Sequence, residues 1–194
     1  MKKWVDRGGR LLLIADHMPL AGAAQKLAAA FGVAFTDGFA IKAYQTEAGR
    51  DSSFSTPTLF RRTDGTLPAH PIVRGRDSSE SITQVRSFTG QAFRATVASV
   101  APVMVLPKDF ISIEPRYAWQ FSPATTRRDV GGWLQGATMR LGRGRVAFFG
   151  EAAMFSAQVA GPNRTPMGMN APLADQNPQF VLNTLHWLTG LIDP

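Results

Sequence analysis

An uninterrupted apolar run, LLLIA at residues 11–15, constrains the fold of this chain more than any other sequence feature. It follows the pair Gly8-Gly9, which suits a tight turn, and it is followed directly by Asp16 and His17. A short apolar run without alternation is typical of a strand buried on both faces, as in a parallel sheet covered by helices. Open sheets of this kind bind ligands at the carboxyl ends of their strands. We therefore predict a central strand at 11–15, with Asp16 and His17 at a candidate site.

The next segment is typical of a helix and a second strand. Residues 20–31 are rich in Ala and Leu, with apolar residues three and four positions apart. Gly32 ends this helix, and residues 33–35 predict a short strand. Strand, helix and strand together indicate a parallel βαβ unit with a right-handed crossover.

A second apolar strand also ends in a polar residue. Residues 133–141 and 145–149 flank the turn sequence Gly-Arg-Gly and predict a β-hairpin. Its second strand is apolar and ends at Gly150-Glu151. If this strand and residues 11–15 are neighbours in one sheet, Asp16, His17 and Glu151 converge on one crevice.

The remaining segments predict one domain, residues 1–194. Residues from about 40 to 81 form a long stretch without periodicity, which we predict as an inserted loop region with some β character. Asn177 as N-cap, Pro178 at the first helical position and Gly190 just past the end predict a last helix. We find no internal repeat and no interdomain linker.

Composition limits the classes of partner. The 194 residues are 44% hydrophobic, enough for one sizeable core. Lys and Arg number 21 against 14 Asp and Glu, a net charge of +7, but the arginines are scattered and not interleaved with aromatic residues. No apolar run approaches the ~20 residues of a membrane-spanning helix. We therefore expect no specific nucleic-acid partner and no membrane span.

The start of the chain bears on its compartment. Two lysines follow Met1, as in a signal peptide, but Asp6, Arg7 and two glycines stand where the apolar region should follow. As written, the chain is expected in the cytoplasm. If residues precede Met1, a location in the cell envelope is expected instead.

Three stretches carry a family resemblance: WVDRGGRLLLIADHMP at 4–19, GRGRVAFFGEAAMF at 142–155 and NPQFVLNTLHWLTG at 177–190. Together they resemble the class I glutamine amidotransferase-like superfamily, within it a bacterial branch distantly similar to the ThuA-like proteins. The resemblance implies an α/β fold, a flavodoxin-like three-layer α/β/α arrangement with a mostly parallel sheet. Family members carry earlier strands before the segment matching residues 4–5, so it also implies an N-terminally truncated sheet. An incomplete edge of that kind could pair with a second copy in a homo-oligomer.

The resemblance does not extend to amidotransferase chemistry. In catalytic members, the turn after the strand corresponding to 11–15 carries a nucleophilic Cys. Here that turn is Asp16-His17, and the chain has no Cys. We therefore expect no glutamine hydrolysis by a thiolate, while the question of another enzyme activity stays open.

Asp16, His17 and Glu151 are the candidate catalytic residues and also candidate ligands of a divalent metal. Two carboxylates and an imidazole can bind such an ion or act as general acid and base. The structural alternative is that Asp16 satisfies backbone donors in the turn before Pro19, while Glu151 caps the segment that follows it.

Three functional hypotheses follow. The leading one is a ligand-binding domain for a small or sugar-like molecule, with no certain cofactor, and a site formed by Asp16, His17, Glu151, Ser156, Gln158 and Asn170. The second is a hydrolase that uses metal or carboxylate and His groups on a small or carbohydrate-like substrate. The third is a structural module that assembles through its incomplete sheet edge.

Overall fold

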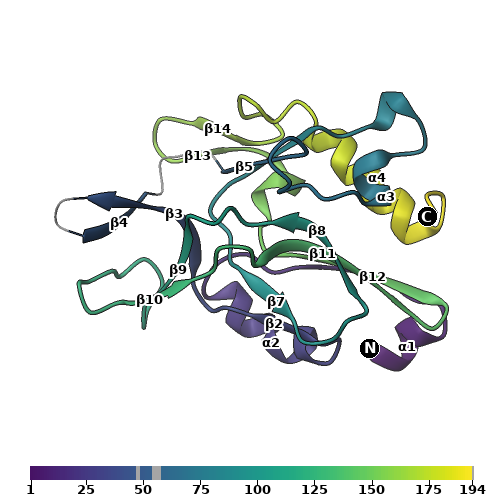
Figure 1. The fold of residues 1–194 in the computed structure, drawn as a ribbon, viewed down its shortest axis with the longest axis horizontal. Coiled ribbons are helices and arrows are strands. Elements are labelled where there is room, and N and C mark those ends of the chain that lie inside the picture. The colour runs from purple at the N-terminus through teal and green to yellow at the C-terminus, as the bar shows by residue number, and fades with distance from the viewer. Residues whose placement is uncertain (47–48, 54–57, 194) are drawn as a thin grey trace.

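The computed structural model describes residues 1–46, 49–53 and 58–193, and its regular structure is mostly β, with 35% strand and 21% helix. The strands form several sheets, most of them antiparallel, that curl into a half-barrel (Figure 1). The prediction of a flavodoxin-like three-layer α/β/α fold with a mostly parallel sheet is therefore wrong. The strand pairings give the reason.

The largest sheet has six strands, in the order β1-β12-β11-β7-β2, with β8 also paired to β11. Only the β1 and β12 ladder is parallel within this sheet, and its other ladders are antiparallel. The strands are β1 (Arg10–Ile14), β2 (Val33–Phe35), β7 (Phe93–Ala95), β8 (Val100–Val105), β11 (Leu134–Leu141) and β12 (Gly144–Phe149). The hairpin predicted at 133–149 is confirmed as β11 and β12.

The predicted parallel βαβ unit is wrong in its pairing. Its strands β1 and β2 lie in one sheet, but β12, β11 and β7 stand between them. Following the direction of each ladder from β1 across to β2, the two strands run antiparallel. The physical reason is that β2 hydrogen-bonds to β7, a strand far along the chain, rather than to β1.

Three smaller sheets complete the β structure, and their described ladders are all antiparallel. A four-stranded sheet has the order β10-β9-β3-β4, and two pairs, β5 with β6 and β13 with β14, stand apart from it. The strands are β3 (Phe39–Thr46), β4 (Gly49–Ser53), β5 (Thr58–Arg61), β6 (Gln84–Ser87), β9 (Phe110–Glu114), β10 (Thr126–Asp129), β13 (Ala157–Ala160) and β14 (Thr165–Gly168).

The stretch from 40 to 81 is therefore not mainly loop. It supplies most of β3 together with β4, β5, helix α3 (Pro71–Arg74) and the 3₁₀ helix η1 (Ser78–Glu80). Residues 47–48 and 54–57 of this stretch lie outside the described part of the chain. Its apolar residues Phe60, Ile72 and Val73 are buried in the core, so the stretch is part of the fold.

The helices cover two faces of the β1 and β12 region (Figure 1). Phe148 packs with Phe31 just after α2, with ring centroids 6.1 Å apart, and Phe149 packs with Phe180 of α4 at 5.7 Å. The predicted strand at 11–15 is thus confirmed as β1, with helices packed on the region it shares with β12. Its predicted central position is wrong, because β1 stands at the edge of the sheet and pairs with β12 alone among the described strands. The remaining helices are α1 (Lys2–Asp6), α2 (Leu20–Ala29), η2 (Ala153–Phe155) and α4 (Asn177–Thr189).

The last helix, α4, matches its prediction closely, and Gly190 after it takes the left-handed conformation, with φ of 88°. None of the helices within 1–46, 49–53 and 58–193 has both the length and the apolar character needed to cross a membrane.

Candidate functional site

The parallel pairing of β1 with β12 places two carboxyl groups at one end of the sheet. Ile14 pairs with Phe149, and the Ala15 N–H donates to the Phe149 carbonyl over 2.9 Å. Asp16 and Glu151 each stand two residues beyond that last pair. The prediction that these two apolar strands are neighbours is therefore confirmed, and it brings both acids to the same end.

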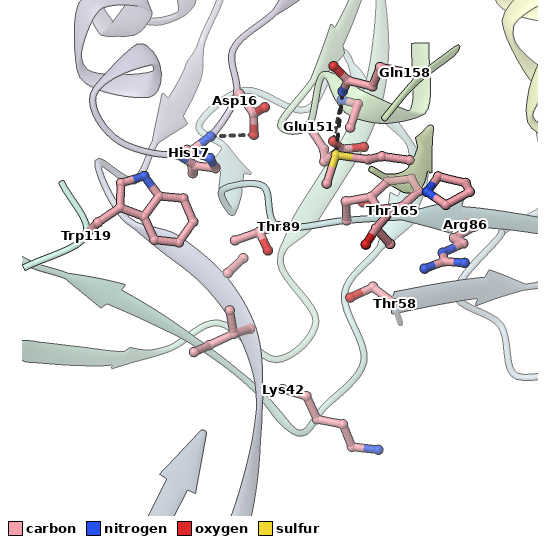
Figure 2. Close-up of a pocket in the computed structure, with 17 residues that line it drawn as sticks. Asp16, His17, Lys42, Thr58, Arg86, Thr89, Trp119, Glu151, Gln158 and Thr165 are labelled. Carbon is pink, nitrogen blue, oxygen red and sulfur yellow. Dashed lines mark hydrogen bonds between the residues drawn. The ribbon is translucent and has the colours of Figure 1, made fainter. Parts of the chain in front are cut away.

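A cavity of about 350 Å³ opens at this end of the sheet (Figure 2). It lies where the large sheet, the four-stranded sheet and the two strand pairs meet. Most of the residues that line it are polar, namely Asp16, His17, Lys42, Thr58, Arg86, Ser87, Thr89, Glu151, Gln158 and Thr165, and the lining also includes the aromatic side chain of Trp119. Ligand pockets in proteins are typically ~300–1,000 Å³, so the volume suits a small molecule.

Glu151 is fully buried, with none of its surface exposed to solvent. Its carboxyl oxygens accept hydrogen bonds from the backbone N–H groups of Ala153 and Met154, the latter over 2.9 Å, at the start of η2. Burial raises the pKa of Glu151 to about 8, the charge of Asp16 adds to the rise, and the backbone hydrogen bonds oppose it. The capping role predicted as the structural alternative is confirmed, and the group is mostly protonated at neutral pH.

Asp16 is half-buried and lines the same cavity. Its Oδ1 accepts from the His17 N–H over 2.7 Å, so the structural alternative of a turn contact is also confirmed. Burial raises the pKa of this carboxyl, while hydrogen bonds from His17 and Ala152 and the neighbouring imidazole lower it. Unlike Glu151, Asp16 keeps part of its surface open to the cavity.

The His17 ring is held in a defined orientation. Its Nδ1 donates to the Met18 carbonyl over 2.8 Å, because a carbonyl can only accept. The ring stacks on Phe39 at 4.7 Å and meets the edge of Trp119 at 4.9 Å. In the neutral ring, Nε2 is then an acceptor, and it has no hydrogen-bond partner among the described residues.

The other predicted site residues separate into two groups. Gln158 lines the cavity, whereas Ser156 and Asn170 are not part of its lining. Ser156 Oγ donates to the Ala153 carbonyl over 2.9 Å, and Asn170 Nδ2 donates to the Gln158 carbonyl over 3.4 Å. Both of these side chains make local contacts instead.

The predicted metal site finds no support in the geometry. In the part of the chain that the structure describes, no three His, Asp or Glu side chains are grouped so that they could hold a metal ion. Asp16, His17 and Glu151 share a cavity without forming such a group.

Several cavity residues were not predicted from the sequence: Lys42, Thr58, Arg86, Thr89 and Trp119. Lys42 and Thr58 fall in the stretch interpreted as a loop, and Trp119 follows β9 in a segment for which the sequence analysis predicts no element. The alternating aromatic residues Tyr117, Trp119 and Phe121 are a signal in the sequence that could have pointed to this side of the cavity.

Comparisons with known proteins add little to this geometry. Neither a family model nor a curated protein matches the chain. One similar solved structure is a ThuA-like protein from Parabacteroides merdae, with a TM-score of 0.38 and 11% identity. The match covers 99% of this chain, but this chain spans only 64% of that protein. This degree of similarity decides neither the family nor the function of the chain.

Proposed function

We propose that this protein binds a small, hydroxyl-rich molecule such as a sugar or polyol in the cavity beside Asp16. The observation that carries the proposal is that a partly open carboxyl group and an aromatic side chain, Trp119, line one cavity. A carboxylate accepts hydrogen bonds from ligand hydroxyl groups, and the face of an indole ring packs against apolar C–H groups.

The binding groups are held in place before a ligand arrives. Trp119 is 54% exposed, yet its ring contacts Phe39 at 4.5 Å and Phe121 at 6.2 Å. His17 is fixed through its Nδ1 contact and leaves Nε2 available for a ligand hydroxyl. Groups that need little reordering lose less entropy when a ligand binds, and this favours affinity.

A matched pair of variants tests the proposal. Asp16→Asn keeps the oxygen that accepts from the His17 N–H but removes the charge, whereas Asp175→Asn makes the same change at an exposed residue outside the cavity lining. Binding of monosaccharides, disaccharides and polyols is measured by thermal shift and by titration calorimetry. At least one ligand should raise the melting temperature of the wild type and of D175N.

The same ligand should bind D16N about ten-fold or more weakly, because a hydrogen bond to a charged group contributes about 1.5–3 kcal/mol. Trp119→Phe should remove most of the change in tryptophan fluorescence on binding. The proposal fails if no compound in the panel shifts the wild type, or if D16N binds as tightly as D175N.

A hydrolase is the second candidate, and the raised pKa of Glu151 is the observation that favours it. An acid with a pKa of about 8 beside a second carboxyl matches the division of roles between a general acid and a general base. In this candidate the neutral Glu151 is the acid and Asp16 is the base. The complete burial of Glu151 makes the hydrolase the weaker candidate, because a general acid must reach the leaving group.

Chromogenic aryl glycosides and esters test the hydrolase. Turnover by the wild type should fall as the pH rises through about 8, and Glu151→Gln should abolish it while preserving the neutral form of the side chain. Absence of turnover across these substrates, or full activity in E151Q, would reject this candidate and leave the binding proposal standing.

A further inference from the structure

Arg86 of β6 lines the cavity from a fixed position. Its backbone N–H donates to Asn177 Oδ1 over 3.0 Å, and its carbonyl accepts from Asn177 Nδ2 over 2.7 Å. Asn177 belongs to α4 and is 1% exposed, so the backbone of Arg86 is held by a buried amide side chain. The side chain extends from there into the cavity lining.

The guanidinium group of Arg86 is only partly satisfied. Nη1 donates to the Pro172 carbonyl, and the group lies 4.8 Å from the centre of the Phe88 ring. Nε is buried and has no hydrogen-bond acceptor among the described residues. A buried donor without a partner costs ~1–3 kcal/mol, so the described residues compensate the guanidinium group of Arg86 only in part.

The charge of Arg86 is also unbalanced. Other arginines pair with acids: Arg76 with Glu80, Arg128 with Glu114, and both Arg140 and Arg145 with Asp193. No carboxylate among the side chains that the structure describes, those of residues 1–44 and 58–193, pairs with Arg86, and burial lowers its pKa. The cation therefore loses solvation and gains no counter-ion from these described side chains.

Hydroxyl groups line the cavity on the same side. Thr58, which is 8% exposed, and Thr165 lie on the Arg86 side in Figure 2, while His17 and Trp119 lie on the other side. Neither threonine hydroxyl has a hydrogen-bond partner among the described residues. Two hydroxyl donors and one edge of a guanidinium group match the oxygens of a carboxylate or a phosphate.

We propose that Arg86, with Thr58 and Thr165, forms an anion subsite that binds the carboxylate or phosphate group of the cavity's ligand. This inference rests on the proposed function and narrows it. Asp16 and Trp119 hold the hydroxyl-bearing part, and Arg86 holds an acidic group at the other side. The ligand class is then an acidic sugar-like molecule, such as a sugar acid or a sugar phosphate.

The test uses inorganic phosphate and acetate as probes, with the intact protein at constant ionic strength. Arg86→Gln removes the cation, and Arg94→Gln is the matched control. Arg94 is exposed, stacks 5.4 Å from the Trp133 ring and does not line the cavity. Both variants lose one positive charge, so non-specific attraction of anions to a chain of net charge +7 changes equally in both.

Titration calorimetry should show saturable binding of at least one probe to the wild type and to R94Q. R86Q should bind that probe about ten-fold or more weakly, and Arg86→Lys should be intermediate because an ammonium group keeps the charge but not the planar fork. Phosphate as the tighter probe assigns the subsite to a phosphate group, and acetate as the tighter probe assigns it to a carboxylate.

The inference is overturned if neither probe binds the wild type saturably, or if R86Q and R94Q bind alike. Circular dichroism checks the folding of each variant, and if R86Q is unfolded, the comparison of wild type with R86K decides the outcome. Its failure is distinct from that of the proposed function. If neutral sugars bind the wild type while neither phosphate nor acetate binds it saturably, the anion subsite alone is refuted. Probe binding without any sugar binding refutes the sugar site alone.

Discussion

Asp16 and Glu151 occupy equivalent positions, each two residues past the last pair of the parallel β1 and β12 ladder. This symmetry brings two acids together where the burial of Glu151 prevents both from being charged easily. The charge of Asp16 adds to the effect of burial on Glu151, so Glu151 keeps its proton to a higher pH than an isolated carboxyl group does. The consequence is a pH-dependent stability.

The folded state should lose stability as the pH rises between 6.5 and 8. Glu151 has a pKa of about 8 in the folded state against an ordinary value of 4.5, so the folded chain keeps a proton that the unfolded chain has released. The stability that this proton contributes is fully present below pH 4.5 and is lost as the pH rises through 8. One proton corresponds to a slope of at most ~1.4 kcal/mol per pH unit.

Urea unfolding at several pH values measures this slope. Glu151→Gln cannot titrate and should flatten the profile, whereas Asp175→Asn, a change at an exposed acid, should keep the wild-type slope. The raised pKa of Asp16 acts in the same direction as that of Glu151. An unchanged slope in E151Q would show that the ionisation of Glu151 is not coupled to folding.

His70 should produce the opposite trend at lower pH. Its Nδ1 accepts from the Ile72 N–H over 3.1 Å at the start of α3, and its Nε2 meets Thr138 Oγ1 at 2.8 Å. Burial, with a smaller contribution from the charge of Arg74, lowers the pKa of His70 from 6.5 to about 4. Its contribution to stability is present above pH 6.5 and is lost as the pH falls through 4.

His70→Asn isolates this effect, because Asn can still accept at the helix start but does not titrate. As the pH falls below 6.5, the free energy of unfolding of H70N should rise relative to that of wild type by up to ~1.4 kcal/mol per pH unit. His70→Ala should lose ~1–3 kcal/mol at pH 7, since the Ile72 N–H loses its acceptor. Parallel urea profiles for wild type and H70N between pH 4.5 and 6.5 would contradict the assignment.

Local signals in the sequence predicted the elements that create the site. A few neighbouring residues specify each of them: the apolar run at 11–15, the hairpin with glycines at 142 and 144, and the last helix, with Pro178 near its start and Gly190 just past its end. The pairing of β1 with β12, and hence the meeting of Asp16 with Glu151, followed from two apolar strands in one core. The elements themselves need no knowledge of distant contacts, whereas the pairing of β1 with β12 was only a condition of the predicted site.

Long-range pairing decided what the sequence could not predict. Val33–Phe35 is an apolar strand in any sheet, but its antiparallel ladder with Phe93–Ala95 overturned the expected βαβ unit. The family resemblance favoured a parallel sheet and gave no indication of this antiparallel pairing. Arg86 and Trp119 reach the cavity through segments that are far apart in sequence, so no local pattern could predict their proximity.

Asn177 gives a test that separates a helix cap from a bridge between elements. The sequence predicts it as N-cap, but it is the first residue of α4, and its amide bridges both backbone groups of Arg86. As a cap, Asn177→Asp should be neutral or stabilising, because Asp caps as well as Asn and suits a helix N-terminus. If Asn177 acts as a bridge, Asn177→Asp removes the donor to the Arg86 carbonyl and should lower the free energy of unfolding by ~2 kcal/mol.

The measurement is the midpoint of urea unfolding at pH 7. Asn170→Asp introduces the same charge at an exposed position and should change stability by less than ~0.5 kcal/mol. If N177D is as stable as wild type, the bridge to β6 contributes nothing to stability, and the result favours Asn177 as a helix cap.

Two arginines that share one acid should differ strongly in their effect on stability. Arg140 and Arg145 both pair with Asp193, but Arg140 has 47% of its side chain exposed and Arg145 has 8%. Arg145 Nη1 also donates to the Trp187 carbonyl over 2.6 Å and to the Ile192 carbonyl over 3.1 Å, which closes the C-terminal end of α4. Arg145→Met leaves the Ile192 carbonyl without this donor and the Trp187 carbonyl with only the Gly190 N–H, and it should cost ~2–4 kcal/mol.

Arg140→Met removes only an exposed ion pair and should cost less than ~1 kcal/mol. Thermal and urea unfolding of the two variants at one ionic strength measure the difference. Raising the salt concentration should reduce the small effect of R140M further and leave that of R145M nearly unchanged, because buried hydrogen bonds are poorly screened. Equal losses in the two variants would mean that the shared ion pair with Asp193, and not the closure of α4 by Arg145, is what stabilises this end of the protein.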